Sequence, residues 1–231
     1  MSDAMPNVPP RADVAILANG ERPTHGIPLR IFRDAGRVIA CDGAWRTAIE
    51  LGRKPDAVVG DCDSIAAGAR ETLAELGVPL VEEGEQDTND LCKAFRYAIR
   101  TCGAADGRIV ILGATGKRED HAIGNVFHLI DFAEASPAVS MVTDFGVFEV
   151  AMPPGRSWSV PQGGCAVSVF APFADTRMSS EGLRWPLDGV AFGSLWRGTL
   201  NRAVGETFSI RTDRPAIVFR SHVQPDGGYV Q

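Results

Sequence analysis

The sequence has little of what marks several common protein classes. Its five cysteines are an odd number without C-x-x-C spacing, which argues against disulfides or a zinc site and predicts buried thiols in a reducing compartment. A net charge of -6 argues against binding of nucleic acid, which needs a basic face to neutralise phosphates. No stretch approaches the roughly 20 apolar residues of a membrane span, and no basic segment followed by an apolar core opens the chain. We therefore expect a cytoplasmic protein that binds small molecules, with no nucleic-acid or membrane partner.

Histidine is also scarce, and the four histidines form no Ser-His-Asp or Cys-His pattern. Two lie on one predicted helix, and His25 and His222 lie in segments without a clear pattern. Covalent catalysis by a protein nucleophile is therefore disfavoured. Metal-assisted transfer of a phosphorus group fits better, because that chemistry depends on positioning and charge neutralisation.

Hydrophobic residues, 45% of the 231, suffice for one large domain or two modest ones. Up to about residue 150, short apolar runs alternate with helical patterns, which is typical of βα units and a mainly parallel sheet. Strands are expected at Val14–Leu17, Val38–Cys41, Ala57–Gly60, Pro79–Val81, Ile109–Leu112 and Val139–Val142. One expected helix runs from about Asp120 to Ala133, with Ile123, Val126, Phe127 and Ile130 facing the sheet.

The pattern changes near Ala151. From there, turn signals recur between short β-rich stretches, which predicts an all-β sandwich or barrel. The sequence thus predicts a flexible tail (1–12), an α/β domain (13–150) and a smaller all-β domain (151–231).

Acidic segments follow the ends of several predicted strands. In an open α/β sheet, the carboxyl ends of the strands share one edge, where ligands bind. We expect these carboxylates to converge there and to bind Mg²⁺, which prefers oxygen ligands and substrate phosphates. The segments contain Asp42, Asp61 and Asp63, Asp87 and Asp90, and Asp120.

Asp61 and Asp63 are two residues apart, so an extended backbone points both carboxylates to one side. An alternative is that Asp63 and Ser64 only cap the next helix. A cap does not require two acids after a glycine, so metal binding is favoured.

Asp87 and Asp90 precede or begin a predicted helix, where acids also suit the helix dipole. The metal-site interpretation rests on Lys93, which the helical spacing places with Asp90 and Tyr97 opposite the apolar stripe. A lysine beside a metal ligand is suited to phosphate oxygens.

The segment Gly113–Gly116 lies between a strand and a helix, the setting in which backbone N–H groups bind phosphate. It lacks the ending of a P-loop, so the motif alone is weak. Arg118, Asp120 and Asn125 strengthen it. Asp42 alone is consistent with a helix cap, and Asn19-Gly20 alone with a turn.

These segments together resemble the thiamine pyrophosphokinase family. The motifs occur in the family's order and spacing: DGA at 42–44, GDCDS at 60–64, QDTND at 86–90, GATGKREDH at 113–121 and EGLRWPL at 181–187. The resemblance implies transfer of pyrophosphate from ATP to thiamine, giving thiamine diphosphate and AMP. It further implies an α/β domain that binds ATP and Mg²⁺, a C-terminal β-sandwich that binds thiamine, and a homodimer with active sites at the interface.

The resemblance also assigns roles to residues of this chain. Mg²⁺ ligands would be Asp61, Asp63 and Asp90, which with Asp87 and Lys93 form the catalytic group. Residues around ATP would be Asp42, Gln86, Arg118, Asp120, His121 and Asn125. Thiamine would contact Trp196, Thr199 and Asn201.

Three positions depart from the family pattern: Asn89 replaces a threonine, Lys117 a glycine, and Leu200 a serine that helps to bind thiamine. We expect Thr199 to supply the missing hydroxyl and Trp196 an aromatic wall, although a core position for Trp196 fits equally well. Trp185 is expected to be structural. Two alternative functions are a related pyrophosphokinase acting on a hydroxymethyl-pterin and a non-catalytic nucleotide sensor.

Overall fold

The computed structural model describes residues 11–62, 68–161 and 164–222. Asp63, Ser64 and most of the N-terminal tail lie outside these ranges. The chain divides into two compact units between Asp144 and Phe145, and each is described by itself.

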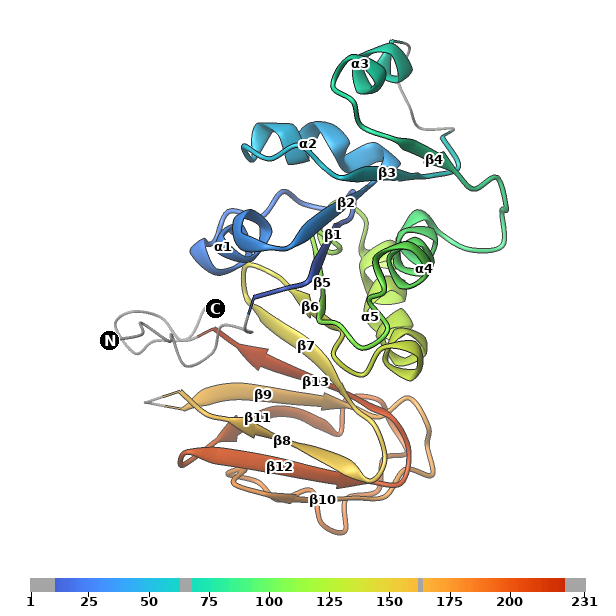
Figure 1. Cartoon of the computed structure of the whole chain (residues 1–231). Helices are drawn as coiled ribbons and strands as arrows, with labels where there is room; N and C mark the ends of the chain where they lie inside the picture. Colours follow the sequence, from blue (N-terminus) through green and yellow to red (C-terminus); the bar gives the residue numbers. More distant parts are fainter. Residues whose placement is uncertain (1–10, 63–67, 162–163, 223–231) are drawn as a thin grey trace. The chain divides into compact units, whose positions relative to one another are not determined.

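The first unit is built on parallel strands in the order β6-β5-β1-β2-β3-β4. Every residue of β1, β3 and β5 is buried, as expected for strands covered on both faces. Figure 1 shows α1 and α2 on one side of this sheet and α4 and α5 on the other. The strands are β1 (Val14–Leu17), β2 (Arg37–Cys41), β3 (Ala57–Gly60), β4 (Leu80–Glu82), β5 (Ile109–Leu112) and β6 (Ser140–Val142).

The helices of this unit are α1 (Gly26–Asp34), α2 (Trp45–Glu50), α3 (Ala69–Glu75), α4 (Asp90–Cys102) and α5 (Glu119–Ala135), with a 3-10 turn η1 (Asp42–Ala44) before α2. Helix α1 was not expected from the sequence. His25 caps it, because its Nδ1 accepts a hydrogen bond from the Ile27 N–H at 3.2 Å. The carboxylate of Asp144 accepts hydrogen bonds from the N–H groups of Thr24 and His25, which anchors the start of the helix.

Helix α5 turns a different face to the interior than the one predicted. Ile123, expected to face the sheet, is 61% exposed, and its predicted partners Val126, Phe127 and Ile130 are only half-buried. The buried side chains are those of Asn125, Leu129, Phe132 and Ala133. The helix is apolar on more than one side. The side that packs inward contains the polar residue Asn125, so the sequence pattern does not mark it as the buried side.

The second unit contains two antiparallel sheets, ordered β11-β9-β13-β7 and β10-β12-β8. One buried apolar cluster takes residues from both, among them Val167 of β9 and Phe208 of β12, so the unit is a β-sandwich. The predicted fold class, an α/β part followed by a smaller all-β part, is confirmed. The strands are β7 (Gly146–Ala151), β8 (Gly155–Ser159), β9 (Cys165–Phe170), β10 (Met178–Glu181), β11 (Gly198–Ala203), β12 (Thr207–Thr212) and β13 (Ala216–Ser221).

Two expectations from composition can be compared with the structure. All five cysteines are free thiols, and Cys41, Cys92 and Cys165 are buried. Among the described residues, no helix is both long and apolar enough to cross a membrane.

Candidate active site

Three aspartates meet at the carboxyl end of the parallel sheet. Asp42 follows β2, Asp61 follows β3, and Asp90 is the first residue of α4. One carboxylate oxygen from each lies within 4.8 Å of the others. The predicted convergence of acids from separate strand ends is therefore present for these three, which we call the acid cluster.

The close approach of the acid cluster depends on the backbone after β3. A Cβ at Gly60 would lie 2.7 Å from the Cβ and Cγ of Asp42, so only glycine fits there. Cys62 has a positive φ of 66°, and its N–H donates to the Asp42 carboxylate at 3.2 Å. The Asp61 N–H donates to Asp90 at 3.3 Å. These donors partly offset the repulsion between the carboxylates.

Lys93 supplies a positive charge beside two acids of the cluster. Its Nζ lies 3.3 Å from Asp61 Oδ2 and 3.6 Å from Asp90 Oδ1. Lys93 was placed with Asp90 opposite the apolar stripe of α4, and the two side chains do lie together, but the Lys93 side chain is only 1% exposed. Burial lowers the pKa of Lys93, but the hydrogen bond to Asp61 and the charge of Asp90 outweigh it and leave the pKa above its ordinary value. The ammonium is therefore a fixed partner of the acids.

Asp42 is the most deeply buried acid of the cluster, at 1% exposure. Burial and the charge of Asp90 raise its pKa to about 6. Three carboxylates face one ammonium, so the cluster keeps an excess of negative charge that suits a divalent cation. Asp63, expected to be a further ligand, lies outside the described residues.

Gln86 and Asp87 lie on an exposed turn before α4. Glu85 organises this turn: its carboxylate accepts hydrogen bonds from the N–H groups of Asp87, at 2.9 Å, and Thr88, at 3.2 Å. Arg96 of α4 pairs with the same carboxylate at 2.5 Å. Hydrogen bonds from Thr88 and Arg96 lower the pKa of Glu85 to about 2, so it stays ionised. The sequence analysis missed Glu85 and Arg96, because a Glu–Arg pair eleven residues apart carries no motif.

The loop of residues 113–118 joins β5 to α5 and is held by a second loop after β1. The Gly20 N–H donates to the Gly113 carbonyl at 2.6 Å, and the Glu21 N–H donates to the Thr115 carbonyl at 2.7 Å. A Cβ at Gly20 would lie 2.4 Å from both of these carbonyl oxygens. Asn19-Gly20 is therefore more than an isolated turn, because it fixes the shape of the loop expected to bind phosphate.

Arg118 and Asp120 form an exposed ion pair at the start of α5, at 2.5 Å. The hydrogen bond from Arg118 lowers the pKa of Asp120 to about 2. His121 is exposed beside them, whereas Asn125 is only 8% exposed.

A cavity of about 500 Å³, which we call the rim cavity, brings many of these groups together. Its lining includes Asn19, Gly20, Asp61, Asn89, Asp90, Gly116, Lys117, Arg118, His121 and Asn125. Of the other expected residues, Asp42 and Lys93 are buried, and Gln86, Asp87 and Asp120 are exposed outside the lining. Asp61 and Asp90 of the acid cluster thus border the same space as the loop 113–118.

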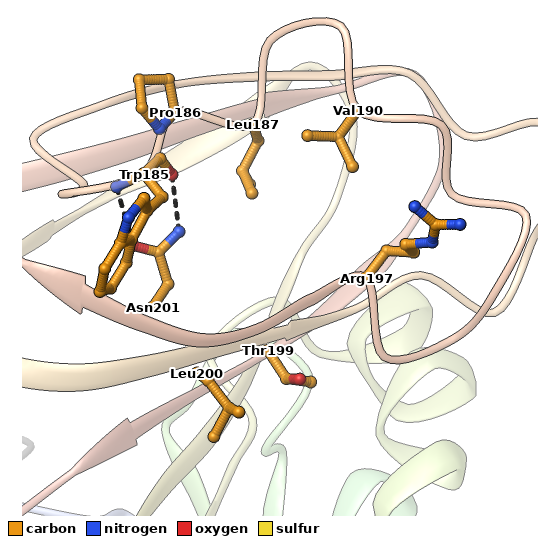
Figure 2. A pocket seen from close by; sticks show the side chains of 8 residues that line it. All are labelled: Trp185, Pro186, Leu187, Val190, Arg197, Thr199, Leu200 and Asn201. Atoms are coloured by element: carbon orange, nitrogen blue, oxygen red, sulfur yellow. Dashed lines mark hydrogen bonds between the residues drawn. The ribbon is translucent and has the colours of Figure 1, made fainter.

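A second cavity of about 260 Å³ lies in the β-sandwich unit, and we call it the Trp185 cavity. Asn201 is 6% exposed and holds the backbone of Trp185 from both sides: it donates to the Trp185 carbonyl at 2.7 Å and accepts from the Trp185 N–H at 3.2 Å (Figure 2). The indole itself is 55% exposed, and the structural role expected for Trp185 stays a prediction. The guanidinium of Arg184 stacks 5.3 Å from its ring centroid.

The segment expected to bind thiamine is only partly in this cavity. Thr199, Leu200 and Asn201 line it, but Trp196 does not. Trp196 is 68% exposed, which rules out the core position considered for it. The Thr199 hydroxyl donates to the Trp196 carbonyl at 2.8 Å. Leu200, at a β-bulge with a positive φ of 58°, is 87% exposed and points away from the Trp185 side chain (Figure 2).

Comparison with known proteins follows this division of the chain. A family model described as the thiamin pyrophosphokinase catalytic domain matches residues 29–141, and one described as the thiamin pyrophosphokinase substrate-binding domain matches residues 157–219. Thiamine pyrophosphokinase 1 of Oryza sativa subsp. japonica is 30% identical over an alignment of 242 residues. The alignment covers 92% of this chain and 90% of that protein. The chain belongs to the thiamine pyrophosphokinase family.

Solved thiamine pyrophosphokinase structures share the fold. The enzyme from Geobacillus thermodenitrificans is 25% identical with a TM-score of 0.73, and the comparison covers 93% of this chain and 99% of that one. The enzyme from Bacillus subtilis is 22% identical with a TM-score of 0.75, covering 91% of this chain and 99% of that one. The thiamine pyrophosphokinase catalytic model spans the acid cluster and the loop 113–118, and the substrate-binding model spans the Trp185 cavity.

Proposed function

We propose that this protein transfers pyrophosphate from ATP to the hydroxyl group of thiamine, giving thiamine diphosphate and AMP. Membership of the thiamine pyrophosphokinase family supports the reaction. The observation that carries the proposal on this chain is the acid cluster with its buried Lys93, next to a loop suited to phosphate.

Asp42, Asp61 and Asp90 would hold Mg²⁺, with Asp63 as a further candidate from the family resemblance. The close spacing of their oxygens and the excess of carboxylates over ammonium fit a hard divalent cation. Bound Mg²⁺ would neutralise the polyphosphate charge that builds up during the transfer. Lys93 holds the carboxylates of Asp61 and Asp90 in place through its two ion pairs, and its ammonium would add positive charge near the transferred group.

ATP would occupy the rim cavity, with its phosphates on the loop 113–118. Arg118 at the mouth offers a guanidinium for phosphate oxygens, and its partner Asp120 orients it. Gln86 and Asp87, presented by the turn that Glu85 holds, would complete the nucleotide site, with His121 at its edge.

Thiamine would bind at the Trp185 cavity. The exposed indole provides an aromatic face for the cationic thiazolium ring. Asn201 fixes the backbone that carries this indole, and Thr199 can accept a hydrogen bond because its own hydroxyl hydrogen is donated to Trp196. We assign the aromatic wall to Trp185 and a peripheral place to Trp196.

A homodimer is the assembly in which we expect the enzyme to work, with thiamine from one subunit's sandwich reaching the acid cluster of the partner. Large apolar side chains are exposed on each unit, Ile123 and Trp196 among them, and would be covered if they lay in such an interface. Light scattering coupled to size-exclusion chromatography measures the mass of the protein in solution, which should be twice that of one chain.

Chromatography of a reaction containing protein, Mg²⁺, ATP and thiamine tests the reaction itself. We expect AMP and thiamine diphosphate as products, and Asp61→Asn should lower kcat about 100-fold or more. The exposed Asp106→Asn serves as a matched charge control and should not change kcat. ADP as the main product would overturn the proposal.

A further inference from the structure

Two asparagine side chains join the start of α4 to the loop 113–118. Asn89 caps α4, since its Oδ1 accepts from the Cys92 N–H at 3.0 Å. Its Nδ2 donates to Asn125 Oδ1 at 3.0 Å. The Nδ2 of Asn125 in turn donates to the Ala114 carbonyl at 2.9 Å. We call this chain of hydrogen bonds the amide relay.

The relay has a single direction. The Cys92 N–H can only donate and the Ala114 carbonyl can only accept, so the two ends fix how each amide is turned. Asn89 must offer its nitrogen to Asn125, and Asn125 must offer its oxygen to Asn89. An acidic side chain at position 89 could cap the helix equally well but could not donate.

The relay connects two parts of the rim cavity that come from distant segments. Asn89 precedes Asp90, which belongs to the acid cluster, and Ala114 belongs to the loop tied down by Gly20. Asn89, Asp90, Ala114 and Asn125 all line the cavity. With Asn125 only 8% exposed, both ends of its amide are held by the protein.

We propose that Asn89 and Asn125 are positioning residues that set the spacing between the acid cluster and the loop 113–118, so that one polyphosphate engages both at once. Asn125 then acts on the nucleotide through the loop rather than as its main ligand. The inference rests on the proposed function, because it takes the rim cavity as the ATP site.

The first test uses Asn89→Asp, which keeps the helix cap and removes the donor. Calorimetric titration with a non-hydrolysable ATP analogue and Mg²⁺ should show a Kd about tenfold higher than wild type, as expected for one buried hydrogen bond. The KM for thiamine should stay within about twofold, and the melting temperature within about 3 °C.

A neutral double-mutant cycle removes the effect of the added charge. It compares Asn89→Ala, Asn125→Ala and the double variant in the same titration. If the two side chains act as one relay, the Kd of the double variant for the analogue should be no higher than that of the single variant that binds it less tightly. Additive losses would overturn the relay.

Other outcomes also decide the matter. An unchanged Kd for Asn89→Asp, or equal loss of analogue and thiamine binding together with a lower melting temperature, would overturn the positioning role. Wild-type protein that makes no AMP and fails to bind the analogue would overturn the proposed function, and this inference with it.

Discussion

At the scale of single residues, the raised pKa of Asp42 makes the stability of the folded protein depend on pH. This pKa is raised from 3.8 to about 6 by burial and by Asp90, so the folded state binds a proton more readily than the unfolded state. The contribution of Asp42 to stability is therefore greatest below about pH 4 and declines as the pH rises to about 6.

Asp42→Asn should consequently raise the free energy of unfolding in EDTA at about pH 8, by about 1–2 kcal/mol, and change it little at about pH 4. Urea denaturation at the two pH values measures this difference. Asp106→Asn, on an exposed turn, is the control and should show no such pH dependence. An equal effect of Asp42→Asn at both pH values would contradict the raised pKa as its cause.

The two exposed tryptophans of the sandwich unit make a matched pair. Trp185→Leu should raise the KM for thiamine about tenfold with the KM for ATP unchanged, because it removes the aromatic face of the cavity. Trp196→Leu, outside the lining, should change either constant by less than about threefold. The reverse ranking in steady-state kinetics would move the thiamine site to Trp196.

Which site residues could be predicted depended on whether their chemistry shows in the local pattern. Asp42, Asp61 and Asp90 follow strands, and parallel strands bring such residues together. The burial of Lys93 could not be read from its helical spacing, because ion pairs with two acids, rather than apolar contacts, hold it inside. Glu85 acts through a turn and a distant arginine, which leave no pattern in the sequence.

At the scale of elements, backbone hydrogen bonds join the loop after β1 to the loop 113–118. Gly20→Ala would put a Cβ 2.4 Å from two backbone oxygens, so the loop must shift. We expect a loss of about 1–3 kcal/mol in stability and a higher KM for ATP, with the KM for thiamine unchanged.

Gly26→Ala is the control for this variant, since a Cβ there meets nothing within 4 Å. Because Gly26 begins α1, alanine should leave stability unchanged or raise it by up to about 1 kcal/mol. Thermal unfolding and ATP kinetics of both variants test the pair. Equal changes in melting temperature and in the KM for ATP for the two variants would show that the close contacts of Gly20 do not affect stability or ATP binding.

The elements themselves differed in how well the sequence predicted them. Strands such as β1, β3 and β5 are continuous apolar runs, and the sequence predicts their bounds as the structure has them. Helix α1 begins at a glycine with Pro28 in its first turn and is fixed by Asp144, more than a hundred residues away, so no local pattern marks it. The inward face of α5 was mispredicted because tertiary hydrogen bonds of Asn125 override its polarity.

At the scale of the whole molecule, metal binding should be visible as stability. A ligand that binds only the folded state stabilises it, by about 2.7 kcal/mol at 100 times its Kd. Mg²⁺ in place of EDTA should therefore raise the melting temperature of wild type, and much less so that of Asp90→Asn. A calorimetric scan measures both, and equal responses would place the cation elsewhere.

The position of β1 in its sheet has a consequence for biosynthesis. Val14 pairs with Arg37 of β2 on one side and with Ile109 of β5 on the other. A nascent chain can add β2 to β1 soon after both leave the ribosome, but the other side of β1 stays open until β5 has been made. Pairing across such long separations closes slowly. The apolar strand β1 thus keeps one unpaired edge until Ile109 and the rest of β5 have been made. We expect chaperones to matter most during this part of synthesis.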